Sequence, residues 1–281
     1  MGEAVNQNGM SHRLLAIDLD GTLLRDDRSV AAEDLAAIRT ARSAGIHVTI
    51  VTGRIASGAL PTAREVGIET LIVCADGAQI VQPATGELIA RKSLPGKATR
   101  AALAVLTGRR LTPFVLTHEA IHARRGAESF APWVVSWSPD LRLHSPDEPV
   151  WPELRDVAIV LGIGSREIVG EALDALAESL PPSASAVAFP MGSDDVWGVR
   201  VQARGCTKST GLSALAARLG VRRTDVAYVG DWYNDICAFA WAGRSFCMAH
   251  SPQDVKRHAG EVLRANNTQG GGVAEVLQRW M

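Results

Sequence analysis

The chain of 281 residues has the length of one or two domains. Its 47% hydrophobic and 21% charged residues exclude a mainly disordered protein. The 29 basic residues balance the 30 acidic ones to a net charge of -1, so no overall positive field favours nucleic acid or an acidic membrane surface. An aromatic share of 5% also argues against a stacking platform for single-stranded nucleic acid.

The four cysteines, Cys74, Cys206, Cys237 and Cys247, form no C-x-x-C pair. This spacing predicts buried thiols in a reducing compartment and offers neither a disulfide framework nor a thiolate metal site. No segment approaches the ~20 apolar residues of a membrane helix, and the first residues lack the apolar stretch of a signal peptide. We therefore expect a soluble, cytoplasmic protein with a frayed leader over residues 1–10. The sequence gives no indication of its oligomeric state.

Short apolar runs alternate with segments of helical periodicity in the first 80 residues. A continuous apolar run is typical of a strand that is covered on both faces, as in a parallel sheet. The expected strands are residues 14–17, 46–51 and 71–74, and the expected helices are 31–44 and 54–66, the second disturbed by Pro61. This order predicts βαβ units.

Prolines and tryptophans gather after a short apolar segment at residues 79–81, which indicates an inserted second domain. Within it we expect strands at 158–161 and 196–201 and an amphipathic helix at 167–180. Strand and helix alternation resumes beyond the insertion, with helices at 208–219 and 234–242, a strand at 226–229 and a short strand near Phe246. The sequence thus predicts an α/β protein with one parallel sheet, in which residues 1–82 and 205–281 form the core and residues 83–204 the insertion.

Polar signals follow several of these strands, where an open parallel sheet binds its ligands. Each alone is common turn chemistry, so their agreement carries the argument. They are Asp18 and Asp20, then Thr52-Gly53-Arg54, then Gly230-Asp231-x-x-Asn234-Asp235, together with Lys208 at the start of a helix.

Carboxylates gathered at one sheet edge repel one another, and a hard cation relieves that repulsion. Mg²⁺ suits such a site because it binds through one or two carboxylates and accepts a phosphate oxygen as another ligand. A neighbouring carboxylate could then attack phosphorus and form an acyl phosphate, while the second acid serves the leaving group. Thr52 would supply a hydroxyl donor, and Lys208 a fixed positive charge beside a helix N-terminus.

These residues resemble the haloacid dehalogenase (HAD) superfamily, and within it the Cof-type phosphatases. Residues 18–24 (DLDGTLL), 51–54 (VTGR), Lys208 and 230–235 look like the four motifs of that family in order. The segments 252–256 and 266–277 are similar to the closing segments of the subgroup. The resemblance covers about residues 13–82 and 203–281, and it implies a Rossmann-like core with an α/β cap inserted between the second and third motifs.

The resemblance also implies a role for each motif residue. Asp18 would be the nucleophile and a Mg²⁺ ligand, and Asp20 the general acid/base whose backbone carbonyl also binds the metal. The phosphoryl group would be held by Thr52, Gly53, Lys208 and Asn234, and the metal by Asp18, Asp20, Asp231 and Asp235, the last directly or through water. The expected activity is Mg²⁺-dependent hydrolysis of a small phosphorylated metabolite, such as a sugar phosphate, through an aspartyl-phosphate on Asp18.

Three places depart from the subgroup's pattern, one of which is Ala238, where a Met is common. Asp76 stands where Asn is usual, and an extra acid near a phosphate weakens phosphate binding unless it is paired or turned away. Residues 248–251 (MAHS) replace the usual Met-Gly-Asn-Ala, which bears on specificity more than on catalysis.

Other functions remain open at this point. His118-Glu119-x-x-His122 matches a zinc-peptidase pattern, although the residues before it look like a strand and not a helix. Gly162-Ile163-Gly164 begins like a dinucleotide-binding loop, but Glu167 occupies the third glycine position, so we expect a tight turn. A phospho-receiver module would use similar acids without a large insertion, and a phosphomutase or phosphotransferase would use the same site.

Overall fold

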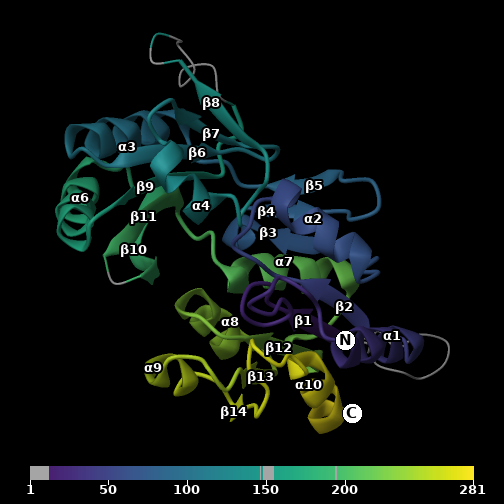
Figure 1. The fold of residues 1–281 in the computed structure, drawn as a ribbon. Helices are drawn as coiled ribbons and strands as arrows, with labels where there is room; N and C mark the ends of the chain where they lie inside the picture. Colours follow the sequence, from purple (N-terminus) through teal and green to yellow (C-terminus); the bar gives the residue numbers. More distant parts are fainter. Residues whose placement is uncertain (1–12, 146, 148–154, 194) are drawn as a thin grey trace. The chain divides into compact units, whose positions relative to one another are not determined.

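The computed structural model describes residues 13–145, 147, 155–193 and 195–281 (Figure 1). The leader expected to be frayed lies outside these residues. The chain divides into two compact units. Unit 1 comprises Met1–Gly53, Leu60–Ile89 and Thr207–Met281, and unit 2 comprises Arg54–Ala59 and Ala90–Cys206.

Unit 1 is built on a five-stranded sheet in the order β14-β13-β12-β1-β2, in which every neighbouring pair is parallel. The strands are β1 (Leu14–Ile17), β2 (His47–Ile50), β12 (Val226–Gly230), β13 (Arg244–Cys247) and β14 (Glu261–Val262). β1 is an interior strand between β12 and β2, and all four of its residues are fully buried, which explains its continuous apolar run. The predicted α/β fold with a parallel sheet is confirmed.

Four helices of this unit fall close to their predicted positions: α1 (Ala32–Ser43), α2 (Ala56–Glu65), which begins in unit 2, α7 (Lys208–Leu219) and α8 (Ile236–Trp241). The unit also contains α9 (Gln253–Lys256) and α10 (Gly272–Trp280), which are not among the predicted helices. α8 starts two residues later than expected because Tyr233–Asp235 forms a 3-10 turn first.

The third predicted strand exists but has different neighbours. β3 (Ile72–Cys74) pairs antiparallel with β4 (Gln79–Val81), and β5 (Leu88–Arg91) completes this small separate sheet. A single parallel bridge, Val51 to Val73, connects β3 with the chain that follows β2. The chain reverses after β3 through the 3-10 turn Ala75–Gly77, whose residues all have positive φ.

Unit 2 contains a six-stranded sheet with helices on one face. The strand order is β10-β11-β9-β6-β7-β8, antiparallel except for the β7–β8 pair. Its strands are β6 (Thr112–Leu116), β7 (Ile121–Arg124), β8 (Leu141–His144), β9 (Ile159–Gly164), β10 (Ala184–Ser193) and β11 (Val196–Ala203), and its helices are α3 (Gly96–Gly108), the short α4 (Ala131–Val134) and α6 (Arg166–Ser179). α3 and α6 cover one face of the sheet (Figure 1), where Leu106, Val160 and Leu176 share an apolar core.

The expected glycine turn after the strand at 158–161 is wrong. Gly162 and Gly164 continue β9 as regular strand residues. A Cβ on Gly162 would lie 2.6 Å from Leu106 Cδ2, and one on Gly164 would lie 2.4 Å from Leu111 Cδ2. These glycines therefore make room for leucines of the core and form no phosphate-binding loop.

The zinc-peptidase alternative is also wrong, because no helix carries its two histidines. His122 lies in strand β7, and His118 lies in the turn that precedes it. His122 Nδ1 contacts His144 Nε2 at 3.0 Å across the β7–β8 pair, and the two rings stack.

All four cysteines are free thiols, of which Cys74, Cys206 and Cys247 are buried and Cys237 is partly exposed. Within the described ranges, the helices are all too short or too polar to span a bilayer.

Asp34 of α1 stabilises unit 1 by holding the start of α10. Its fully buried carboxylate accepts the N–H groups of Gly271 (2.8 Å) and Ala274 (2.9 Å) and so caps the start of α10. Asp34→Ala leaves two buried N–H groups without this acceptor, so we expect the free energy of unfolding to fall by about 2 kcal/mol. Urea denaturation would measure the change, with exposed Arg39→Ala on the same helix as the control. A loss no larger than that of the control would contradict this capping role.

Candidate active site

Asp18 and Asp231 meet at the carboxyl edge of the parallel sheet. Asp18 follows β1, and its N–H donates to the carbonyl of Val229 in β12 (2.9 Å), one residue from the end of that strand. Asp231 follows β12 directly. Because the two strands are parallel neighbours, the side chains that follow them emerge at the same edge.

The loop after Asp18 wraps closely around Asp231. Thr22 Oγ1 donates to Asp231 Oδ1 at 3.1 Å. A Cβ on Gly21 would lie only 2.4 Å from Asp231 Oδ2, and the φ of Gly21 is +77°. The Asp-Gly-Thr sequence thus combines a glycine where the backbone approaches a carboxylate with a hydroxyl that orients it.

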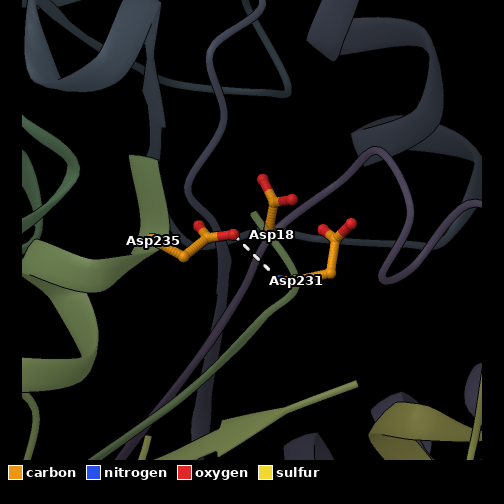
Figure 2. Close-up of side chains that lie close together, drawn as sticks. All are labelled: Asp18, Asp231 and Asp235. Carbon is orange, nitrogen blue, oxygen red and sulfur yellow. Dashed lines mark hydrogen bonds between the residues drawn. The ribbon is translucent and has the colours of Figure 1, made fainter. Parts of the chain in front are cut away.

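A third carboxylate completes an acidic cluster of Asp18, Asp231 and Asp235 (Figure 2). One oxygen of each lies within 4.8 Å of the others, and all three residues are buried. Within the part of the chain that the structure describes, this is the only group of three or more potential metal ligands among His, Cys, Asp and Glu. Such a set of oxygen donors fits a hard cation such as Mg²⁺.

Lys208 lies between two of these carboxylates. Its Nζ is 2.6 Å from Asp18 Oδ1 and 2.6 Å from Asp235 Oδ1, and the residue is 1% exposed. Burial lowers the pKa of Lys208, but Asp18 and Asp235 outweigh that effect and raise the pKa above its ordinary value. Lys208 therefore carries a permanent positive charge inside the site.

Local sequence determines where Lys208 sits. Thr207 caps α7: its Oγ1 accepts the N–H of Thr210, and Thr210 Oγ1 accepts the N–H of Thr207. A Cβ on Gly77, whose φ is +91°, would lie 2.2 Å from the Thr207 carbonyl oxygen. Only glycine allows the 75–77 turn to approach the start of α7 this closely.

Asp235 accepts four hydrogen bonds. Its Oδ1 accepts from Lys208 Nζ and from the hydroxyl of Tyr228, and its Oδ2 accepts the N–H groups of Asp231 (2.9 Å) and Trp232 (2.8 Å). The bond to Asp231 is drawn in Figure 2. These contacts use the acceptor capacity of a carboxylate and fix the loop that carries Asp231.

The three carboxylates outnumber the one ammonium group. Burial raises the pKa of Asp18 well above its usual range, Lys208 opposes this, and Asp235 and Asp231 add to it. Burial also raises the pKa of Asp231, although the hydrogen bond from His250 lowers it. Three acidic groups thus face one ammonium group, and a divalent cation would favour their ionised forms.

Three of the predicted phosphate-binding residues, Thr52, Gly53 and Asn234, lie near Asp76. Thr52 is 1% exposed; its N–H donates to the carbonyl of Val73 (2.9 Å), and its own carbonyl accepts the N–H of Asp76 (3.0 Å). Asn234 Nδ2 donates to Asp76 Oδ1 at 2.9 Å, and a Cβ on Gly53 would lie 3.6 Å from that same nitrogen. Asp76 is therefore paired, and an acid that is paired need not weaken phosphate binding at this position.

Asp20 lies apart from the buried cluster. It is two residues beyond Asp18, is solvent-exposed, and forms an isolated bridge with Leu24.

Two residues of the site escape prediction. His250 accepts the N–H of Asn267 at Nδ1 (3.2 Å), so its Nε2 carries the proton that faces Asp231 Oδ2 at 3.3 Å. Tyr228 lies inside an apolar strand and donates its hydroxyl to Asp235. Two sequence features could have indicated them: His250 replaces the subgroup's usual residue, and Tyr228 places a hydroxyl in an otherwise apolar run.

Comparison with known proteins identifies the family. Residues 15–277, nearly the whole chain, match the sequence family of haloacid dehalogenase-like hydrolases. The chain belongs to this family. The resemblance that the motifs carry is confirmed, and the chain is an enzyme of the phosphatase type.

Two similar relatives are phosphatases of Bacillus subtilis (strain 168). The 5-amino-6-(5-phospho-D-ribitylamino)uracil phosphatase YcsE is 23% identical over 99% of this chain and 99% of its own length. The phosphatase YwpJ is 25% identical over 95% and 99%, respectively.

Solved structures of haloacid dehalogenase-like proteins share the fold. One from Bacteroides thetaiotaomicron superposes with a TM-score of 0.83 at 20% identity, covering 96% of this chain and all of that one. The subclass IIB sugar phosphatase BT4131 has a TM-score of 0.76 at 19% identity, covering 95% and 98%.

The raised pKa of Asp18 predicts a pH dependence of stability. A carboxyl group whose pKa is higher in the folded state lowers the stability of the folded protein as the pH rises from 3.8, the ordinary pKa, through the folded-state pKa. In EDTA, the melting temperature of Asp18→Asn minus that of the wild type should therefore increase as the pH rises above 3.8.

A matched control is Asp27→Asn. Asp27 is fully exposed and hydrogen bonds from Ser29 lower its pKa, so its melting-temperature difference should stay flat above pH 3.8. If the melting-temperature difference of Asp18→Asn were equally independent of pH, the pKa of Asp18 would not be raised in the folded state.

Proposed function

We propose that the chain is a Mg²⁺-dependent phosphatase that hydrolyses a small phosphorylated metabolite through an aspartyl-phosphate on Asp18. The observation that carries this proposal is Lys208 between Asp18 and Asp235, inside a buried cluster of three acidic side chains. Burial favours the neutral form of Asp18, which is not a nucleophile, and Lys208 opposes this effect by favouring the carboxylate.

Asp18 and Asp231 would hold the cation, together with the backbone carbonyl of Asp20. Asp235 would support the site from behind, because its four hydrogen bonds already tie it to Lys208 and to the loop of Asp231. When bound, Mg²⁺ neutralises phosphate charge and orients the phosphoryl group for in-line displacement.

The residues of the chain divide the reaction between them. A carboxylate oxygen of Asp18 forms a bond to phosphorus as the bond from phosphorus to the leaving oxygen breaks, and Asp20 gives that oxygen its proton. Asp20, now ionised, then takes a proton from the water that attacks the phosphorus of the aspartyl-phosphate, which returns Asp18 and releases phosphate. Lys208, Thr52, the Gly53 backbone and Asn234 hold the phosphoryl oxygens throughout.

The substrate class follows from the site and from the relatives. YcsE acts on a phosphorylated ribityl compound and BT4131 on sugar phosphates, by their names. We extend this to a small phosphorylated polyol or sugar for this chain, with the insertion at residues 83–204 as the cap that selects it. The four free thiols suit a reducing compartment such as the cytoplasm.

The direct test is hydrolysis of p-nitrophenyl phosphate by purified protein. Activity should require Mg²⁺, disappear in EDTA and return when Mg²⁺ is added in excess. Asp18→Asn should lose at least about 1,000-fold in kcat, because an amide is not a nucleophile for this step. Hydrolysis by Asp18→Asn at the wild-type rate would refute the proposal, and so would full activity of the wild type in EDTA.

The role of Asp20 predicts a dependence on the leaving group. Asp20→Asn should lose about 100-fold or more with an alkyl phosphate, whose leaving oxygen needs a proton, and much less with p-nitrophenyl phosphate. Because hydrolysis of the aspartyl-phosphate also uses Asp20, the comparison should measure the rate of leaving-group release in single-turnover experiments. Equal losses with both substrates would remove Asp20 from the acid role.

A further inference from the structure

We propose that Asp76 is a positioning residue that fixes the side-chain amide of Asn234 for binding the phosphoryl group. The inference rests on the proposed function and assigns a role to the acid that departs from the subgroup's pattern. Its basis is the contact between Asp76 Oδ1 and Asn234 Nδ2 at 2.9 Å, which joins residues 158 positions apart in the chain.

Asp76 itself is held firmly. It is 1% exposed, and its N–H donates to the carbonyl of Thr52 at 3.0 Å. Its backbone is left-handed, with φ 47° and ψ 45°, a conformation that aspartate tolerates better than most residues but that still costs free energy. The backbone of Asp76 is thus anchored to Thr52, the residue that the proposed mechanism uses to hold phosphate.

The chemistry of the contact determines the orientation of Asn234. An ionised carboxylate only accepts hydrogen bonds, so the amide must present Nδ2 to Asp76 and direct its oxygen away. One of the two hydrogens on Nδ2 is used by Asp76, and the other remains for a second acceptor, such as a phosphoryl oxygen.

An asparagine at position 76 would specify this orientation less strictly. Its own amide presents either an oxygen or an NH₂ group, and the NH₂ group would repel Nδ2 of Asn234. Asp76 offers oxygens only. It also lies against the phosphate-binding loop, since a Cβ on Gly53 would lie 3.3 Å from Asp76 Oδ2.

A double-mutant cycle separates positioning from other roles. Asp76→Ala and Asn234→Ala should each lower kcat/KM for p-nitrophenyl phosphate by about 10-fold or more, and the double variant should lose no more than the worse single variant. The same variants should raise KM and weaken inhibition by inorganic phosphate, because the lost contact is to the phosphoryl group.

Matched variants keep the test falsifiable. Asp76→Asn retains an oxygen that can accept the bond, so it should keep at least about a third of wild-type activity. Asp174→Ala, an exposed aspartate on α6, should leave activity unchanged. A further loss in the double variant, or an Asp76→Asn as impaired as Asp76→Ala, would overturn the proposal.

A measurement without substrate distinguishes this inference from the proposed function. In ¹⁵N spectra of the wild type, one side-chain amide proton of Asn234 should be protected from exchange. The protection should vanish in Asp76→Ala and persist in Asp76→Asn. Protection with no phosphatase activity in the wild type would refute the function on which the proposal rests; full activity of Asp76→Ala in an active enzyme would refute the positioning role alone.

Discussion

The ammonium group of Lys208 is the charge on which the catalytic unit depends. It contacts Asp18 and Asp235 in a site that water barely reaches, where an unpaired carboxylate would cost several kcal/mol. Asp235 then connects this ion pair to the loop of Asp231 through two backbone N–H groups. One cation thus favours the ionised form of the first strand's acid against the effect of burial and, through Asp235, orders the loop of another acid.

The elements around this ion pair could be predicted from local patterns. β1 and β12 are buried on both faces and therefore read as unbroken apolar runs that stop at Asp18 and Asp231. α7 begins at Lys208 because Thr207 and Thr210 satisfy its first N–H groups. The grouping of these side chains follows from strand ends that share one edge of a parallel sheet.

What could not be predicted depends on partners that are distant in sequence. Periodicity reports that a position is buried but not which group it meets, so Tyr228 read as one more strand residue and Gly162 as a turn. β3 was recognised as a strand, but its pairing with β4 depends on the positive φ angles at residues 75–77. The contact of His250 with Asp231 likewise requires the 266–270 segment, which holds Nδ1 through Asn267.

The position of β1 between β2 and β12 affects how the protein is made. β2 emerges from the ribosome soon after β1, but β12, the strand on its other side, is about 200 residues further along. At translation rates of roughly 5–20 residues per second, that interval lasts about 10–40 s. During this time the nascent chain carries a β1 with one open edge, so a chaperone that shields this edge would act on the protein before its catalytic unit can close.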